Sequence, residues 1–253
     1  MKNIVITGAG SGMGRATAIL LSKNTEYRCI CIGRDQKKLM DTHSAMEHHH
    51  SHLFWSMDIR DHQSWKTHLE NHPEVSSIYG IFANAGVGGE NHFGNNDRWE
   101  EIISTNLTGT YLTIEYLLPL IKKENAPYKN IIITSSCLAR FGVPRYTAYC
   151  TAKTGLLGLT RALAVELAAD KILVNAICPG WVETDMAIAG IQLLANQTGQ
   201  DLNKEIEIQK SYVPLNRFSQ PEEIAIFVQF LLSNEQNSIT GQGLDINNGS
   251  YMI

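Results

Sequence analysis

Short, nearly continuous apolar runs alternate with longer amphipathic stretches along the whole chain. Runs of this kind are typical of parallel strands that are buried on both faces. Helical periodicity separates them, most clearly over Arg98–Lys123 and from about Tyr149 to Ala169. The predicted strands are Asn3–Thr7, Tyr27–Gly33, Leu53–Met57, Ile78–Ala83, Asn130–Ser135, Ile172–Cys178 and Gly243–Ile246.

This alternation predicts an α/β fold, a single Rossmann-type, doubly wound parallel sheet of about seven strands with helices on both faces. A chain of 253 residues without a linker or an internal repeat fits one domain, residues 1–253. An irregular stretch at about Met186–Tyr212 lies between the sixth strand and the helix that begins near Pro221. We expect residues 186–212 to form a substrate lid, with two helices that pad the rim of the sheet as the alternative.

Composition excludes several classes of function. The chain is 43% hydrophobic and 18% charged, and its net charge is -4. It therefore lacks the excess of basic residues that binding to nucleic acid or anionic lipid requires. No apolar run approaches the roughly 20 residues of a membrane helix. The first residues enter a strand pattern at once and do not resemble a signal peptide, so we expect a cytoplasmic protein.

Cysteine and histidine spacing indicates no metal site. The five cysteines lack the spacing of a disulfide framework or a zinc site, so we expect reduced thiols. The histidine-rich run from His48 to His52 has no accompanying cluster of Cys, Asp or Glu. We interpret it as a solvated loop between a helix and a strand.

A glycine-rich turn, TGAGSGMG, follows the first strand and precedes a helix. In this context glycines let the backbone approach a pyrophosphate, which the helix N-terminus then binds. The second strand ends in Gly33-Arg34-Asp35. The guanidinium of Arg34 would bind the 2′-phosphate of NADP. The carboxylate of Asp35 could instead bind the ribose hydroxyl groups of NAD, so NAD remains the alternative cofactor. The expected contacts of the turn are Gly8, Ser11, Gly12, Met13 and Gly14.

Tyr149 and Lys153 are four residues apart, so their side chains share one face of a helix. Ser136 stands thirteen residues before Tyr149, at the end of a strand. Carbonyl reduction needs a proton donor beside the oxygen that gains charge, and a nearby ammonium lowers the pKa of a phenol. A serine hydroxyl can polarise the same oxygen. The three residues together predict carbonyl–alcohol interconversion with Tyr149 as acid/base.

In this order the motifs resemble those of the short-chain dehydrogenase/reductase family, over essentially the whole chain. They are TGAGSGMG, Ala83-Asn84-Ala85-Gly86, Asn106-Leu107-Thr108-Gly109, Ser136, Tyr149-x3-Lys153 and Pro179-Gly180. The resemblance implies a nicotinamide-dependent oxidoreductase that assembles as a homotetramer through its two long helices. It implies that Asn106 holds the water that links Lys153 to solvent, and that Lys153 also binds the nicotinamide ribose.

The resemblance also implies the remaining cofactor contacts. Asp58 and Ile59 would face the adenine. The adenosine side would be lined by Asn84, Ala85 and Gly86. The nicotinamide carboxamide would be oriented by Pro179, Gly180, Val182 and Thr184.

Two features depart from the family pattern. Tyr146 precedes Lys153 by seven residues, a spacing that resembles the divergent enoyl-reductase branch. Members of that branch lack this glycine pattern and the serine, so we interpret Tyr146 as a pocket residue or a packed aromatic. Asn247-Asn248-Gly249 replaces the frequent acidic-Gly-Gly ending, where we expect altered subunit contacts and unchanged chemistry.

The segment Leu138–Asp185 looks most like that of 3-oxoacyl thioester reductases and polyketide ketoreductases. The leading hypothesis is therefore an NADP-linked reductase of a small-molecule ketone, carried on acyl carrier protein or CoA. Arg140 and Arg145 could attract such a carrier, or they are ordinary surface arginines. One alternative is an NAD-linked dehydrogenase of a small or cyclic secondary alcohol. Another is a nonenzymatic dinucleotide sensor, which would not need the intact catalytic residues.

Overall fold

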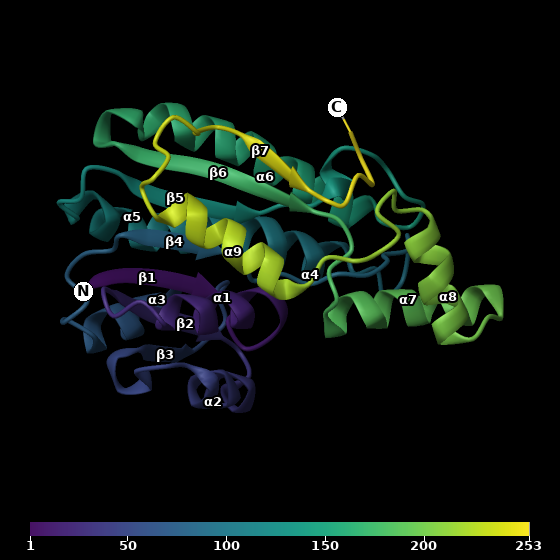
Figure 1. The fold of residues 1–253 in the computed structure, drawn as a ribbon, viewed down its shortest axis with the longest axis horizontal. Helices are drawn as coiled ribbons and strands as arrows, with labels where there is room; N and C mark the ends of the chain where they lie inside the picture. The colour runs from purple at the N-terminus through teal and green to yellow at the C-terminus, as the bar shows by residue number, and fades with distance from the viewer. Residues whose placement is uncertain (253) are drawn as a thin grey trace.

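The computed structural model describes residues 1–252. Seven parallel strands form one sheet in the order β3-β2-β1-β4-β5-β6-β7, as Figure 1 shows. The predicted Rossmann-type α/β fold is confirmed. The strands are β1 (Lys2–Thr7), β2 (Tyr27–Gly33), β3 (Leu53–Ser56), β4 (Gly80–Ala83), β5 (Lys129–Thr134), β6 (Ile172–Pro179) and β7 (Gly243–Ile246).

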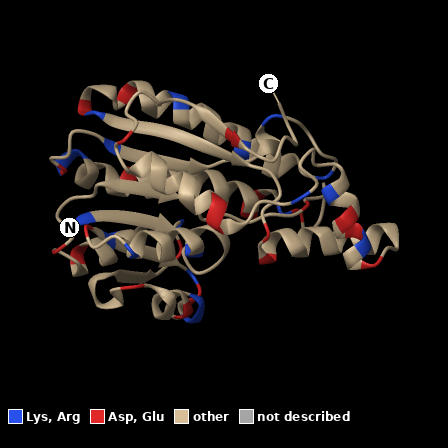
Figure 2. Ribbon diagram, viewed as in Figure 1, with Lys and Arg blue, Asp and Glu red and all other residues tan. Residues whose placement is uncertain are grey.

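Helices cover both faces of the sheet because both faces of its central strands are apolar. In β5, Ile131 and Ile133 belong to the core beneath α3, α5 and α6, whereas Ile132 belongs to the core beneath α1, α2 and α9. The helices are α1 (Gly12–Ser22), α2 (Gln36–Ala45), α3 (His62–Asn71), α4 (Trp99–Ile103), α5 (Gly109–Lys123), α6 (Thr147–Glu166), α7 (Asp185–Thr198), α8 (Leu202–Ser211) and α9 (Pro221–Leu232). Figure 2 shows acidic and basic residues mixed on helices and loops, with the strands almost free of charge.

The long helix predicted over Arg98–Lys123 is interrupted, which corrects the sequence-based prediction. A π-helical turn, Ser104–Thr108, separates α4 from α5. The hydroxyl of Thr110 donates a hydrogen bond to the carbonyl oxygen of Asn106 at 2.8 Å. Such turns insert a residue into an α-helix and are frequent at functional sites. The apolar periodicity continues across the insertion, so it gives no sign of the turn.

The stretch expected to be irregular, residues 186–212, is mostly helical. Thr184 caps α7 and Asp201 caps α8, and Gly199 joins the two helices with a φ of +67°. Ile191 packs against Val213 in a small core of its own. Both helices lie beyond the carboxyl ends of the strands (Figure 1), the edge at which ligands bind in open α/β sheets.

The histidine-rich run forms a short 3-10 turn, His49–Ser51, between α2 and β3. Within residues 1–252, no group of three or more His, Cys, Asp and Glu side chains is placed to hold a metal ion. All five cysteines are free thiols. The helices of this part of the chain are all too short or too polar to cross a membrane.

Candidate active site and cofactor cleft

The glycine turn between β1 and α1 presents main-chain atoms, with few side chains, to the cofactor cleft. Gly8 and Gly12 have φ values of +68° and +51°. A Cβ at Gly14 would lie 2.2 Å from the carbonyl oxygen of Gly8. Ser11 precedes α1 without a side-chain capping bond, so the first N–H groups of the helix remain available to an anion. These features fit the pyrophosphate of a dinucleotide.

The turn lies at the point where the strand order reverses, and hydrogen bonds join the strand ends there. The hydroxyl of Thr7 accepts hydrogen bonds from the main-chain N–H groups of Asn84 (2.9 Å) and Ala85 (3.0 Å). The hydroxyl of Thr134 donates to the side-chain oxygen of Asn84 at 3.2 Å. Two cavities, of about 660 and 560 Å³, share Gly86 in their walls. All of the predicted cofactor residues except Gly12 and Gly14 therefore line one of these two adjoining cavities.

The larger cavity contains the residues predicted for the adenosine end. Arg34 is exposed at its wall. The carboxylate of Asp35 accepts a hydrogen bond from the main-chain N–H of Lys38 at 3.0 Å and thereby caps α2. Lys38 lines the same cavity, and its Nζ lies 3.9 Å from the carboxylate of Asp185. Sequence reasoning missed Lys38, although its place in the first turn of the helix after Arg34 could have indicated it.

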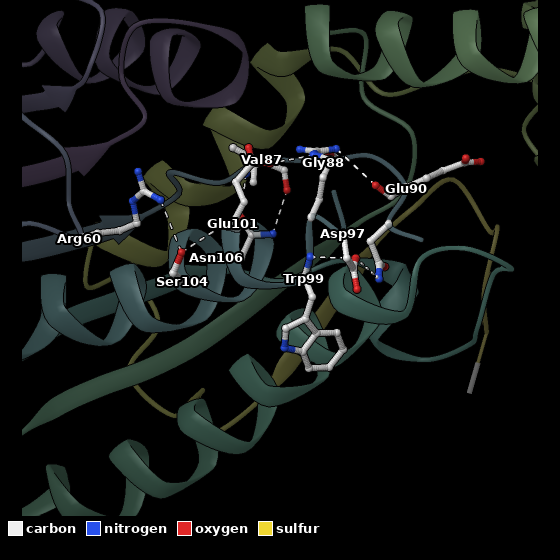
Figure 3. Close-up of polar contacts among 11 residues, drawn as sticks. Arg60, Val87, Gly88, Glu90, Asp97, Trp99, Glu101, Ser104 and Asn106 are labelled. Atoms are coloured by element: carbon white, nitrogen blue, oxygen red, sulfur yellow. Dashed lines mark hydrogen bonds and ion pairs between the residues drawn. The ribbon is translucent and has the colours of Figure 1, made fainter. Parts of the chain in front are cut away.

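Asp58 and Ile59 also line this cavity. Arg60, which sequence reasoning missed, binds the carboxylate of Asp58 with a shortest distance of 2.7 Å. Its hydrogen bond lowers the pKa of Asp58. The guanidinium of Arg60 also reaches the hydroxyl of Ser104 at 3.5 Å, at the start of the π-helical turn (Figure 3). Ile59 is buried against Gly109, where a Cβ would lie 2.7 Å from its Cδ1.

Asn106 is buried in the π-helical turn and binds the loop that follows β4. Its Oδ1 accepts a hydrogen bond from the main-chain N–H of Val87 at 2.7 Å, and its Nδ2 donates to the carbonyl of Val87 at 2.9 Å (Figure 3). A Cβ at Gly86 would lie 2.9 Å from Oδ1 of Asn106 and 3.7 Å from Nζ of Lys153. The structure thus brings Asn106 and Lys153 to the same glycine.

Ser136, Tyr149 and Lys153 line the smaller cavity together. The Nζ of Lys153 donates a hydrogen bond to the carbonyl oxygen of Thr134 at 2.8 Å and lies 5.5 Å from the ring centroid of Tyr149. The hydroxyl of Ser136 accepts a hydrogen bond from the main-chain N–H of Leu138 at 3.1 Å. The three predicted catalytic side chains therefore surround one space.

Burial controls the protonation of this group. Desolvation raises the pKa of Tyr149 to about 12, an effect that the nearby hydroxyl of Ser136 opposes. Desolvation lowers the pKa of Lys153 to about 8. The sequence-based interpretation expected Lys153 to lower the pKa of Tyr149, but the causes of the shift do not include Lys153, and the loss of water around the phenol is the largest of them. Tyr149 consequently keeps its proton at neutral pH, the form that a proton donor requires.

The residues predicted to orient the nicotinamide carboxamide lie at the end of β6 and on the loop that leads to α7, and all of them line the smaller cavity. They are Pro179, Gly180, Val182 and Thr184. A Cβ at Gly12 would lie 3.0 Å from Cγ2 of Thr184, so this loop approaches the glycine turn. A Cβ at Gly180 would lie 3.1 Å from the Cβ of Asn247, the first residue of the unusual Asn-Asn-Gly ending. That ending therefore packs against the candidate nicotinamide loop.

The smaller cavity has mainly apolar walls. Tyr146 lines it too, in agreement with its interpretation as a pocket residue. The apolar side chains of the wall include Leu138, Phe141, Val143, Trp181, Met186 and Val213. Two arginines considered as carrier contacts are engaged elsewhere, since Arg140 pairs with Asp245 at 3.3 Å and Arg145 with Glu90 at 3.4 Å.

This geometry agrees with comparisons with known proteins. Residues 8–250 match a family model of the short-chain dehydrogenase type that is described as enoyl-(acyl carrier protein) reductase. The chain belongs to the short-chain dehydrogenase/reductase family. As a member of that family it is an oxidoreductase of carbonyl and alcohol groups, with a nicotinamide dinucleotide as cofactor.

Individual members of the family match almost the whole chain. The uncharacterized oxidoreductase YxbG of Bacillus subtilis (strain 168) is 32% identical over 98% of this chain and 90% of its own length. The 3-oxoacyl-acyl-carrier-protein reductase FabG of Thermotoga maritima is 31% identical, with 98% and 97% covered. The crystal structure of a single-residue variant of actinorhodin polyketide ketoreductase with NADPH superposes with a TM-score of 0.91 at 26% identity, with 98% and 97% covered.

Proposed function

We propose that the protein reduces a ketone to an alcohol with NADPH, using Tyr149 as the proton donor. The observation that carries this proposal is the arrangement of Ser136, Tyr149 and Lys153 around one cavity that meets the adenosine cavity at Gly86. A nonenzymatic sensor would not need a half-buried phenol and a buried ammonium beside its cofactor cleft, because removing polar groups from water costs free energy.

Each side chain has a role in this mechanism. The bound cofactor supplies the hydride. The hydroxyl groups of Ser136 and Tyr149 hold the substrate carbonyl oxygen, and the proton of Tyr149 moves to that oxygen as it gains negative charge. The ammonium of Lys153 stabilises the phenolate that is left and binds the nicotinamide ribose. Asn106, next to Lys153 at Gly86, holds the water through which Tyr149 regains its proton.

The choice of NADP over NAD follows from the charges around the adenosine cavity. Arg34 and Lys38 both line it, and two cations suit a ribose that carries a phosphate. The carboxylate of Asp35, the candidate acceptor for an unmodified ribose, is engaged as the cap of α2.

For the substrate we propose a 3-oxoacyl thioester, whose acyl chain would occupy the apolar cavity. Relatives of about 30% identity that are named 3-oxoacyl-acyl-carrier-protein reductases support this choice. A second candidate is a small or cyclic ketone that is not attached to a carrier. It is favoured by the ion pairs of Arg140 and Arg145, which leave neither guanidinium unpaired for the phosphate or the acidic surface of a carrier.

The test follows the loss of NADPH or NADH absorbance with purified protein and three substrates. They are the N-acetylcysteamine thioesters of 3-oxobutanoate and of 2-butenoate, and cyclohexanone. We expect the highest kcat/KM for the 3-oxo thioester with NADPH. A higher value for cyclohexanone would select the second candidate, and reduction of the 2-butenoyl thioester alone would replace ketone reduction by enoyl reduction. No turnover of any ketone, including a wider panel, would contradict the proposal.

Two further parts of the proposal concern architecture. We propose that residues 186–212 act as the substrate lid, since Met186 and Tyr212, the two ends of this segment, line the catalytic cavity. We also propose assembly into a homotetramer through α4, α5 and α6. Large apolar side chains support this, because Trp99, Tyr111 and Val165 are 40%, 48% and 81% exposed on these helices. Light scattering of the purified protein tests the assembly, which a monomeric mass would contradict.

A further inference from the structure

The helix that carries Tyr149 is capped from a distant loop. Helix α6 begins at Thr147, two residues before Tyr149, and the residue at its own N-cap, Tyr146, makes no side-chain capping bond. Asn91 takes that role instead. Its Oδ1 accepts hydrogen bonds from the main-chain N–H of Ala148 at 2.9 Å and from the hydroxyl of Thr147 at 3.0 Å. Helix N-termini need such acceptors because their first N–H groups have no partner within the helix.

The side chain of Asn91 is fixed on its other side as well. Its Nδ2 donates a hydrogen bond to a carboxylate oxygen of Asp97 at 3.1 Å, and its main-chain N–H donates to the carbonyl oxygen of Arg145 at 2.8 Å. Asn91 is only 3% exposed. A carboxylate can only accept, so Asp97 determines which end of the amide faces α6. The same carboxylate oxygen accepts from the main-chain N–H of Trp99 at 3.1 Å (Figure 3).

The loop that carries Asn91 also carries the partners of Asn106. Asn106 holds Val87 through two hydrogen bonds, and Arg98 donates to the carbonyl oxygens of Gly88 (3.1 Å) and Glu90 (3.4 Å). Figure 3 shows these contacts joining the loop to α4 and the π-helical turn. One short segment, residues 87–91, therefore connects Asn106 to the first turn of α6.

We propose that Asn91 is a positioning residue, which sets the place of Tyr149 relative to Asn106 and Lys153. This inference rests on the proposed function of Tyr149 as proton donor. Asn91 touches no reacting atom, but it determines where α6 begins, and Tyr149 lies in the first turn of that helix. A displacement of about 1 Å in a catalytic group can cost on the order of 100-fold in rate.

The first test compares Asn91→Ala with Asn95→Ala, a control at an exposed asparagine of the same loop. Asn91→Ala is expected to lower kcat for 3-oxobutanoyl-N-acetylcysteamine about 10- to 100-fold, with the KM for NADPH changed less than about 2-fold. The pH at which alcohol oxidation reaches half its maximal rate should also move, because the phenol is displaced from its neighbours. A merely structural role would lower Tm and leave kcat per folded molecule and this pH midpoint unchanged.

An exchange of donor and acceptor provides the rescue. Asn91→Asp alone places two carboxylates opposite each other and should lower kcat as strongly as Asn91→Ala. In the double variant Asn91→Asp/Asp97→Asn, the amide nitrogen at position 97 can donate to the new carboxylate, whereas the N–H of Trp99, which bonds to the same atom of Asp97, loses its acceptor. This variant is expected to recover most of the kcat that Asn91→Asp loses, since the three side-chain hydrogen bonds of residue 91 can form again.

A readout independent of turnover separates this inference from the proposed function. Hydrogen exchange of the Ala148 amide should become at least about 10-fold faster in Asn91→Ala and stay unchanged in Asn95→Ala. Faster exchange without ketone reduction by the unmodified protein would contradict the proposed function alone. The positioning role is overturned if Asn91→Ala folds with unchanged kcat, pH midpoint and exchange, or if kcat of the double variant is no higher than that of Asn91→Asp.

Discussion

The rings of Tyr146 and Tyr149 meet edge to face in the catalytic cavity, with their centroids 6.3 Å apart. Both phenols therefore lie near the space for the substrate, and the ring centroid of Tyr149 lies 5.5 Å from Nζ of Lys153. Desolvation also raises the pKa of Tyr146, so neither phenol ionises at neutral pH. The two tyrosines can be distinguished by substitution.

Tyr149→Phe removes the proposed proton donor and leaves α6 and the cofactor cavity in place. We expect kcat for ketone reduction to fall at least about 10²–10⁴-fold, the usual loss for a missing acid catalyst. The matched control is Tyr146→Phe, for which a change of less than about 10-fold, mainly in KM, is expected. A near-normal rate in Tyr149→Phe together with loss of activity in Tyr146→Phe would assign the acid role to Tyr146.

Cofactor preference should depend on Arg34. A charge-assisted hydrogen bond to the 2′-phosphate contributes roughly 1.5–3 kcal/mol, or about ten- to a hundredfold in affinity. Arg34→Ala should weaken NADPH binding by this factor and leave NADH binding and the maximal rate nearly unchanged. Gly33→Asp should shift preference toward NADH, because it adds a ribose acceptor and repels the phosphate.

Binding titrations of both cofactors measure these shifts. Lys38→Ala serves as a comparison on the same cavity wall, and a smaller loss is expected because Lys38 is close to Asp185. A higher kcat/KM of the unmodified protein with NADH than with NADPH would exclude the proposed role of Arg34.

Hydrogen bonds of Gln197 should stabilise the closed position of the proposed lid, residues 186–212. Gln197, near the end of α7, accepts a hydrogen bond from Arg145 and donates to the carboxylate of Glu90 at 3.2 Å. Gln197→Ala removes these contacts, and at about 1 kcal/mol this change should raise the opening of residues 186–212 about fivefold. Hydrogen exchange of α7 and α8 measures the opening. Gln192→Ala is the control, because Gln192 binds only Asn196 within the same helix.

With cofactor and ketone bound, exchange in this segment should slow in the unmodified protein, as expected for a lid that closes over substrate. Equally slow exchange with and without ligand would mean that α7 and α8 are a static part of the structure at the edge of the sheet and do not act as a lid. In that case Gln197→Ala would affect stability alone.

Folding stability should decrease at acid pH because of His52. This side chain is 6% exposed, accepts a hydrogen bond from the main-chain N–H of Cys29 at 3.1 Å, and pairs through Nε2 with the carbonyl of Glu47. Its neutral form suits both contacts, and burial lowers the pKa of His52 below 6.5. As pH falls through about 6.5 the unfolded chain binds a proton that the folded protein does not, so stability falls.

The loss from this group is at most about 1.4 kcal/mol per pH unit. It is measured by urea unfolding between pH 5 and 8 for the unmodified protein and for His52→Gln, which offers a donor and an acceptor and does not titrate. We expect a flatter pH dependence in His52→Gln and an unchanged one in His50→Gln, a change at an exposed histidine of the same run. Identical slopes in all three proteins would contradict the assignment.

The sequence by itself determined the order of the elements and predicted which side chains meet in the cleft. Strands β2 and β7 have the predicted bounds, and the other strands differ from them by at most two residues at either end. This agreement has a physical reason, because a strand buried on both faces must be apolar along its whole length. Tyr149, Lys153 and Ser136 were found by their spacing, which reflects one turn of a helix and the end of a strand.

Only the tertiary structure decided what depends on contacts between distant segments. The π-helical turn around Asn106 leaves the apolar periodicity intact, so the pattern could not reveal it. The pKa of Tyr149 depends on how much water the folded cavity excludes, and the ion pairs of Arg140 and Arg145 depend on which carboxylates the fold brings to them. Asn91 lies 57 residues before Ala148 in the chain, and no local pattern encodes a hydrogen bond over that separation.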